Sequence, residues 1–270
     1  MDPAMNRAKP HDIAAYKKWL KDERGAEISV KTENYYLSVT NKISADFRQS
    51  GFWLSLTNQL TQLNQEYYLN TKYYLFSREV PLPPEVHIKP FSSFLLKTFR
   101  KNVVDNEGWP AAPPGGWVLP AAWFTQINDI IRTYFVVKYL DGVSFFVDKL
   151  QAHCRCSNLT CDVAYEAKEE GYYAAHTYVT YPCEVPEENW DTRMIDVQIE
   201  IQVTTQLQEV IRRLLHKYYE QRRKTARSDS VKWQWDYTSE EFAANYLGHI
   251  LHYVEGMIMD VRNRQEETSL

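Results

Sequence analysis

Hydrophobic and polar positions repeat with two different periods along the chain. Near both ends, apolar residues recur every three or four positions, over residues 14–23, 36–69 and 239–264, which is the spacing of amphipathic helices. The middle of the chain holds runs of β-branched and aromatic residues that are typical of strands. These runs are RTYFVVKYL, CDVAYEAK, GYYAAHTYVTY and MIDVQIEIQVTT, beginning at residues 132, 161, 171 and 194. We therefore expect helical ends around a central mixed β-sheet, in the α/β or α+β class.

Breaks in this pattern divide the chain. A proline cluster at residues 80–90 ends the N-terminal helical part, and a helical pattern resumes at 91–103. A loop rich in Trp, Pro and Gly follows at 106–119 and is long enough to be a lid or an insertion. Two more helices are expected at 141–153 and 206–223. We expect one compact domain with a helical N-terminal part (1–75), a core (76–228) and a C-terminal helical extension (229–270).

The C-terminal extension carries an apolar stripe at helical spacing. Its members are Phe242, Tyr246, Ile250, Val254 and Ile258. We expect this stripe to pack inside the protein rather than to form an interface. The sequence leaves the oligomeric state open.

Composition and charge narrow the function classes. The chain has 270 residues and a formal net charge of −4, so no global basic field can hold nucleic acid, and any anion site must be a local cluster. Aromatic residues make up 14% of the chain, and such rings suit a cleft for flat polar ligands. The first residues lack an apolar signal-peptide region, and no apolar run approaches the roughly 18 residues of a membrane span. We therefore expect a cytoplasmic protein without a membrane partner.

Four cysteines in a chain of this length do not form a disulfide framework. Cys154, Cys156 and Cys161 could hold zinc together with His153, but their spacing lacks the paired C-x2-C knuckles of zinc sites. Reduced thiols are the simpler expectation.

Lys89, Ser93 and Lys97 are spaced four residues apart, which places them along one face of a helix that begins at Pro90. Two ammonium groups and a hydroxyl near a helix N-terminus can bind a polyphosphate. A solvated basic helix face is the alternative interpretation of this spacing.

Two carboxylates are candidates for metal binding and base catalysis. Asp129 lies at the entrance to the strand that starts near Ile130, where a capping role is the alternative. Glu200 lies on the polar face of the last strand, with Asp196, Gln198 and Gln202, opposite the apolar face formed by Ile195, Val197, Ile199, Ile201 and Val203. Such a polar stripe either faces water or lines a site. Together, Asp129 and Glu200 would supply the paired carboxylates that Mg²⁺ and base chemistry need.

A third element is the run from Gly171 to His176. Tyr172 and His176 are four residues apart and would share one face of a strand, beside the small residues Ala174 and Ala175. A ring and an imidazole over small neighbours can form a platform for a nucleobase with a phosphate donor. A structural aromatic stripe is the alternative.

In this order, the motifs resemble the synthetase domain of the RelA/SpoT family, in its small alarmone synthetase branch. The resemblance covers roughly residues 50–225. It rests on Lys89-x3-Ser93-x3-Lys97, on Asp129-Ile130-Ile131, on Gly171-Tyr172-x3-His176, on Glu200-Ile201-Gln202-Val203-Thr204-Thr205 and on a following helix with His216 and Tyr219.

The resemblance implies an α+β fold with a mixed sheet of the nucleotidyltransferase-like type, flanked by helices and extended by helices at both ends. Members of the family transfer the β,γ-pyrophosphate of ATP to a ribose 3′-hydroxyl, most commonly of GDP or GTP, which makes ppGpp or pppGpp for the stringent response. The resemblance implies that Lys89, Ser93 and Lys97 hold the ATP phosphates. It implies that Asp129 and Glu200 are catalytic and bind Mg²⁺, with Glu200 also acting as the base. The implied acceptor-binding residues are Tyr172, His176 and Gln202.

Three positions depart from the family pattern. His87 and Tyr134 occupy places where the family usually has arginines on the ATP side, and Glu170 stands where Asn or a basic residue is common. The guanidinium groups of such arginines would bind phosphate or stack on adenine, and this chain lacks them at these two positions. Candidates to replace them are Arg100, Lys101 and Arg132.

Two alternatives to guanosine nucleotide synthesis stay open. Some small members of the family are toxins that pyrophosphorylate the 3′-terminal adenosine of tRNA, and an antitoxin protein would then be a partner. A basic run suits a tRNA backbone, and consists of Arg212, Arg213, Lys217, Arg222, Arg223, Lys224 and Arg227. A degenerate domain that binds nucleotide or protein without turnover is the second alternative, favoured by His87 and Tyr134.

Overall fold

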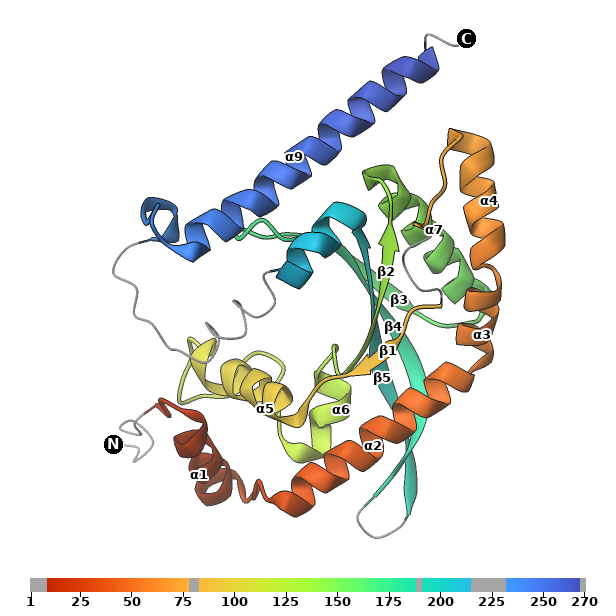
Figure 1. Ribbon diagram of the computed structural model, residues 1–270. Helices are drawn as coiled ribbons and strands as arrows, with labels where there is room; N and C mark the ends of the chain where they lie inside the picture. Colours follow the sequence, from red (N-terminus) through yellow and green to blue (C-terminus); the bar gives the residue numbers. More distant parts are fainter. Residues whose placement is uncertain (1–8, 78–82, 188–190, 215–231, 268–270) are drawn as a thin grey trace. The chain divides into compact units, whose positions relative to one another are not determined.

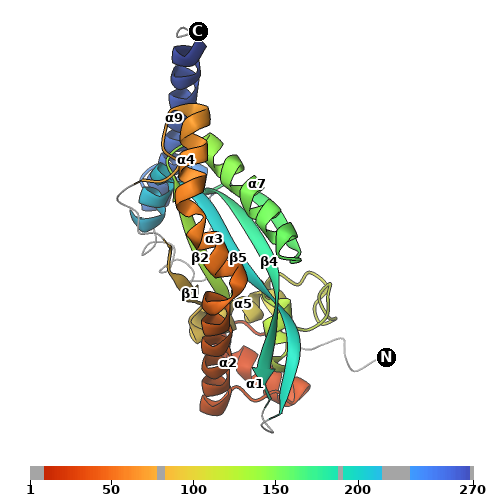
Figure 2. The same cartoon turned by 90° about the vertical axis from the view of Figure 1, so that its right-hand side faces the viewer.

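The structure is a computed structural model that describes residues 9–77, 83–187, 191–214 and 232–267 (Figures 1 and 2). It has an α+β fold in which helices flank a five-stranded mixed sheet of strand order β1-β2-β5-β4-β3. The strands are β1 (Val86–Ile88), β2 (Ile131–Val137), β3 (Cys161–Ala167), β4 (Tyr173–Pro186) and β5 (Thr192–Thr205). The α+β class expected from the sequence is confirmed.

Helices occupy both ends of the chain, as expected. The N-terminal ones are α1 (Ile13–Arg24), α2 (Val30–Gln49), α3 (Gly51–Asn58) and α4 (Leu60–Thr71). They are followed by α5 (Phe91–Phe99), which continues as a π-helical turn at Arg100–Val104, by α6 (Trp123–Gln126), by α7 (Leu140–Cys156) and by the long α9 (Glu240–Glu267). Short 3-10 turns lie at Pro120–Ala122 and Trp233–Trp235. Residues 206–214, directly after β5, are also helical.

The chain falls into two compact units. The first contains Met1–Ser50, Val86–Arg132 and Thr180–Glu200, and the second contains Gly51–Glu85, Thr133–Val179 and Ile201–Leu270. Strands β2, β4 and β5 each continue from one unit into the other. The three-part division expected from the sequence stays a prediction, and its boundary at residue 228 lies outside the described residues.

In the first unit, the N-terminal helices pack against α5. The side chains of Tyr16 and Leu20 from α1 are fully buried against Leu95 and Phe99 of α5. Asp12 fixes the start of α1, because its carboxylate accepts a hydrogen bond from the Ala15 backbone at 2.7 Å. This packing holds α5, the helix that carries two of the candidate phosphate-binding residues.

In the second unit, aromatic side chains cover the apolar face of the sheet. The ring of Phe135 on β2 lies 4.5 Å from that of Phe146 on α7 and 6.1 Å from that of Trp53 on α3. Figures 1 and 2 show α3, α4 and α7 grouped on this face. β3 and β4 pair antiparallel, with Ala164 opposite His176. The opposite, polar face of the sheet is therefore the one that carries the candidate residues.

The expected strands are confirmed, with shifted ends. β2 stops at Val137, earlier than the sequence suggested, because α7 begins at Leu140. β4 begins at Tyr173 because Gly171 adopts a left-handed φ of 76° that no strand residue has. The alternation of β5 is as expected, since Ile195, Val197, Ile199, Ile201 and Val203 are all buried.

The expectation that the apolar stripe of α9 packs inside is wrong for three of its members. Tyr246, Ile250 and Ile258 are 39%, 56% and 40% exposed. The buried side of α9 instead carries polar residues that bind partners elsewhere in the second unit: Glu255 accepts a hydrogen bond from Thr205, and Arg262 pairs with Asp141. In the part of the chain that the structure describes, no helix is long and apolar enough to cross a membrane.

Candidate functional site

A lysine–aspartate–lysine cluster lies in the first unit. The two oxygens of Asp129 bind two ammonium groups, with Lys89 Nζ 2.7 Å from Oδ2 and Lys97 Nζ 2.8 Å from Oδ1. Lys97 also donates to Asn128 Oδ1 at 3.3 Å. The side chains of Lys89 and Asp129 are only 11% and 15% exposed, while that of Lys97 is 29% exposed. The structure thus brings together three of the residues proposed from the sequence.

This cluster has an excess of positive charge. Burial lowers the pKa of Lys89, and the neighbouring charges of Lys97 and Arg132 lower it further, against the raising effect of Asp129. Burial also lowers the pKa of Lys101, and the neighbouring charge of Lys97 lowers it further. Two ammonium groups therefore act on the carboxylate of Asp129, and the positive charges also act on one another. An entering polyanion would relieve this mutual repulsion.

The cluster is fixed by groups that the sequence did not reveal. The hydroxyl of Tyr36 on α2 donates to the carbonyl of Lys89 at 2.7 Å, and its ring lies 4.6 Å from that of Phe94 on α5. Lys89 itself precedes α5, and Pro90 is the cap residue of that helix. Ser93 is exposed on the first turn of α5, one turn before Lys97. The predicted helix face is therefore present, with Lys89 delivered to it by the turn at Pro90.

The polar face of β5 becomes buried along its length. Asp196 is exposed and Gln198 is half-buried, whereas Glu200, Gln202 and Thr204 are 4%, 7% and 4% exposed. A stripe that merely faced water would stay exposed to the end of the strand. The burial therefore excludes the interpretation that the whole polar face of β5 is exposed to water.

Asp129 and Glu200 are suitable ligands for a magnesium ion that arrives with a phosphate substrate. Both residues belong to the first unit, and β2, which follows Asp129, is the neighbour of β5 in the sheet. Among the described residues, no group of three or more Asp, Glu, His or Cys side chains could hold a metal by itself. Mg²⁺ is commonly bound by one or two carboxylates together with substrate phosphates. The donors present fit this mode, in which Asp129 and Glu200 would hold the ion together with the phosphates of the substrate.

A second cluster lies in the second unit and contains the proposed acceptor-binding residues. The hydroxyl of Tyr172 is 3.1 Å from His176 Nε2 and donates to Gln202 Oε1 at 3.4 Å. The hydroxyl of Tyr178 lies 3.5 Å from His176 Nδ1, and Lys168 Nζ lies 5.5 Å from the centre of the Tyr172 ring. His176 and Gln202 are each 7% exposed, while Tyr172 is half-buried. The three residues proposed from the sequence are thus in one hydrogen-bonded cluster.

The turn before Tyr172 is held by α9. A Cβ on Gly171 would lie 2.5 Å from the carbonyl oxygen of Asn245, and a Cβ on Gly248 would lie 2.4 Å from that of Gly171. His249 binds the Tyr173 hydroxyl at 2.8 Å and the carbonyl of Glu169 at 2.9 Å. One local signal could have pointed to this contact, namely a glycine inside a helix rich in aromatic residues.

We expect Gly248→Ala to destabilise the protein by about 1–3 kcal/mol, the usual cost of forcing extra atoms into a packed position. Gly256→Ala on the same helix is the matched control, because a Cβ there has nothing within 4 Å and should stabilise by about 0.5–1 kcal/mol. Urea denaturation of both variants measures the difference. Equal stability of the two variants would rule out the close contact of α9 with the Tyr172 turn.

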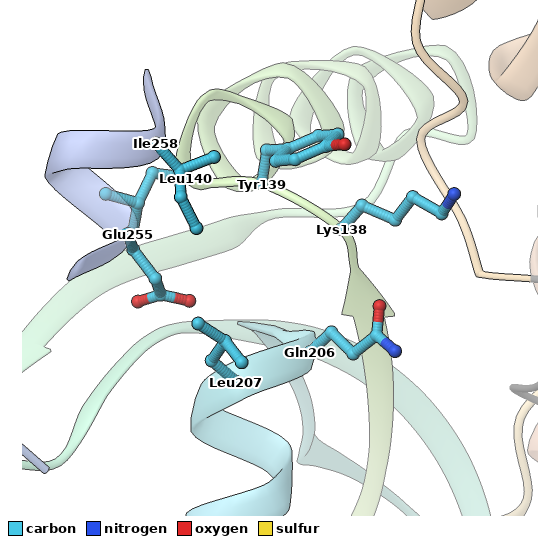
Figure 3. Close-up of a pocket in the computed structure, with 7 residues that line it drawn as sticks. All are labelled: Lys138, Tyr139, Leu140, Gln206, Leu207, Glu255 and Ile258. Atoms are coloured by element: carbon cyan, nitrogen blue, oxygen red, sulfur yellow. The ribbon is translucent and has the colours of Figure 1, made fainter. Parts of the chain in front are cut away.

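A small cavity beside α9 is not the nucleotide site. Its volume is about 120 Å³ (Figure 3), well below the roughly 300–1,000 Å³ of typical ligand pockets. It is lined by Lys138, Tyr139, Leu140, Gln206, Leu207, Glu255 and Ile258. Burial raises the pKa of Glu255. The hydrogen bonds of its carboxylate with Thr205 and His252 have the opposite, smaller effect. The cavity is thus a packing gap where α9 meets the start of α7.

Several other sequence-based candidates have defined positions. Lys101 and Arg132 interact electrostatically with residues of the lysine–aspartate–lysine cluster. Arg100 instead forms an ion pair with Asp105. His153 is bound by the Ser55 hydroxyl and the Phe52 carbonyl, at 3.1 and 3.0 Å. Outside the described residues lie His216, Tyr219, Lys217, Arg222, Arg223, Lys224 and Arg227.

The fold is thus α+β, with the Lys89–Asp129–Lys97 cluster in one unit and the Tyr172–His176–Gln202 cluster in the other. No protein-family model matches the chain, and no curated protein matches it either. Solved structures do match.

The fold is that of the small alarmone synthetases. Small alarmone synthetase 1 from Bacillus subtilis matches with a TM-score of 0.56 and 15% identity, over 88% of this chain and 100% of that one. The same enzyme bound to its product pppGpp also scores 0.56 at 15% identity, over 87% of this chain and 99% of that one. A GTP pyrophosphokinase family protein from Streptococcus pneumoniae matches with a TM-score of 0.53 and 16% identity, over 89% of this chain and 97% of that one. At identities this low the likeness establishes the fold, and function must be argued from the site.

Proposed function

We propose that this chain is a pyrophosphokinase of the small alarmone synthetase type, which transfers pyrophosphate from ATP to the ribose 3′-hydroxyl of GDP or GTP. The observation that carries the proposal is the cluster in which Asp129 binds both Lys89 and Lys97. Its excess of cations suits a triphosphate, and it lies on a fold shared with enzymes of this type. The cytoplasm is the compartment we propose, since the reaction needs ATP and guanosine nucleotides.

In this proposal Lys89 and Lys97, with the hydroxyl of Ser93, bind the phosphates of ATP. Catalysis of phosphoryl-type transfer is mostly positioning and charge neutralisation. When the triphosphate enters, the two ammonium groups exchange one anionic partner, Asp129, for others. This exchange releases the carboxylate of Asp129 for Mg²⁺, which would neutralise charge on the transferred group.

Glu200 is the proposed general base. Its carboxylate takes the proton of the 3′-hydroxyl, while the 3′-oxygen forms a bond to the β-phosphorus of ATP. The bond between that phosphorus and the α,β-bridging oxygen breaks, and AMP leaves. The position of Glu200 on the polar face of β5, in the same unit as Lys89, Lys97 and Asp129, supports this role.

Tyr172, His176 and Gln202 are the proposed acceptor-binding residues. The ring of Tyr172 would stack on the acceptor base, and His176 would contact its ribose or phosphate. Gln202 lies two residues after Glu200 on β5, and side chains two apart on a strand share a face.

The described part of the basic run favours a nucleotide acceptor over tRNA. Arg212 and Arg213 both pair with Glu209, at 2.6 Å each. Burial raises the pKa of Glu209, but the two arginines lower it overall. Glu209 thus offsets one of the two positive charges, which makes this described part of the run less suited to a nucleic acid backbone than the sequence suggested.

Incubating the protein with labelled ATP and Mg²⁺ tests the function, with GDP, GTP, ADP and deacylated tRNA offered one at a time. We expect label on the 3′-oxygen of GDP or GTP. Label on tRNA instead would favour the toxin reaction and make an antitoxin a partner. Binding of ATP without transfer to any acceptor would rule out an enzyme and leave a degenerate binding domain.

A further inference from the structure

Tyr134 and Arg212 form a stacked pair in the second unit. The guanidinium carbon of Arg212 lies 4.5 Å from the centre of the Tyr134 ring, within the range of a cation–π contact. Tyr134 lies on β2, and Arg212 lies on the helical residues 206–214 that follow β5. The guanidinium therefore joins the helical residues after β5 to a ring on strand β2.

Glu209 fixes the orientation of this guanidinium. Arg212 donates to the Glu209 carboxylate from Nε at 2.6 Å and from Nη2 at 2.8 Å. Such a two-point pair holds the planar group by one edge. Neither this pair nor the ring contact uses Nη1 or the face turned away from Tyr134. The Arg212 side chain is 29% exposed, whereas that of Glu209 is only 8% exposed.

The stacked pair also lies near the acceptor cluster. The pKa of Arg212 is raised chiefly by its hydrogen bond to Glu209, and the charges of Tyr134 and Tyr172 add to this effect. Arg212 is thus within electrostatic reach of Tyr172, the ring proposed to stack on a base. The guanidinium of Arg212 therefore lies in the same unit as the ring proposed to stack on a base, and acts on it electrostatically.

The geometry favours a nucleobase over a phosphate. A phosphate that bound Arg212 by two hydrogen bonds would compete with Glu209 for the same guanidinium edge. A flat base can instead stack on the face turned from Tyr134 without displacing either partner, as bases do on arginine planes elsewhere. We propose that the Tyr134–Arg212 stack is a binding platform for the purine base of a nucleotide substrate. That the ligand is a nucleotide rests on the proposed function.

Titration calorimetry with ATP, GDP and inorganic tripolyphosphate, each with Mg²⁺, tests the platform. We expect Arg212→Gln to weaken binding of ATP or GDP about tenfold and to leave tripolyphosphate binding within about twofold. The nucleotide that is weakened identifies which base uses the platform. Arg212→Lys should not restore binding, because an ammonium group has no planar face.

Arg213→Gln is the matched control. Arg213 carries the same charge and pairs with the same Glu209, but its side chain is 68% exposed and covers no ring that the structure describes. We expect its nucleotide affinities to match the wild type. If Arg212→Gln does not fold, as judged by thermal melting, Tyr134→Leu replaces it, because loss of the supporting ring should produce the same base-selective weakening.

The outcomes separate the platform from the proposed function. Equal weakening of tripolyphosphate, an equal effect of Arg213→Gln, or unchanged nucleotide binding would each overturn the platform while pyrophosphate transfer could still occur. Base-selective weakening in a protein that shows no transfer would overturn the proposed function alone. A wild type that binds neither ATP nor GDP would overturn both.

Discussion

Glu200→Gln is expected to reduce pyrophosphate transfer by about 10²–10⁴-fold, the range over which general acid–base groups act. The amide has nearly the shape of the carboxylate, so it fits the buried position at 4% exposure. It can neither accept the hydroxyl proton nor offer a negative charge to Mg²⁺. Because Lys89, Ser93 and Lys97 are unchanged, we expect the affinity for ATP in the absence of Mg²⁺ to change little.

Asp196→Asn is the matched control for this variant. It makes the same carboxylate-to-amide change on the same face of β5, at an exposed position four residues earlier, and should keep wild-type transfer. Steady-state transfer from labelled ATP to GDP or GTP, together with ATP binding, measures both variants. Full activity of Glu200→Gln would remove this residue from the mechanism, and equal losses in both variants would indicate a general effect on β5.

Local pattern was sufficient to predict β2, β3, β4 and β5 and the helical ends of this protein, but it missed β1 (Val86–Ile88) and the division of residues 36–69 among three helices. The alternation of β5 predicted its buried face because side chains on a strand alternate between two environments. The same pattern could not distinguish Asp196, which is exposed, from Glu200, which is buried. That difference arises from what packs over each end of the strand, and this depends on distant parts of the chain.

The candidate site was predicted as a set of residue types, and its contacts were not. Spacing placed Lys89 and Lys97 on one side of a helix, but their shared bond to Asp129 is formed across a long stretch of chain. The support of Lys89 by Tyr36 and the stack of Arg212 on Tyr134 had no local signal. Such contacts follow from how helices and strands pack, which no short-range spacing records.

Asp129→Asn is expected to reduce transfer roughly a hundredfold or more, because stabilisation of charge by a metal ion is worth several kcal/mol. ATP binding in the absence of Mg²⁺ should persist, since Lys89 and Lys97 lose their competing anion. This variant therefore separates the binding of the triphosphate from its activation. Asp105→Asn is the control. The side chain of Asp105 is half exposed, and its carboxylate pairs with Arg100 in the described part of the chain.

The same substitution should also destabilise the fold in a pH-dependent manner. Burial raises the pKa of Asp129, but Lys97 and Lys89 outweigh it and lower the pKa to about 2 from 3.8. A carboxyl whose folded pKa is lowered contributes stability above its unfolded pKa, and that contribution disappears as the pH falls toward the folded pKa. The shift corresponds to about 2 kcal/mol at neutral pH, and leaving the buried Lys89 without its anion adds to the loss.

Urea denaturation at pH 7, 4 and 2.5 measures this effect. We expect the free energy of unfolding of Asp129→Asn to lie about 2–4 kcal/mol below that of the wild type at pH 7. The gap should narrow by roughly 2 kcal/mol as the pH falls from 4 to near 2, because only the wild type then loses a carboxylate that binds two ammonium groups. A gap that stayed constant over this range would show that Asp129 is not held ionised by Lys89 and Lys97, and the phosphate-exchange step proposed for these lysines would have to be abandoned.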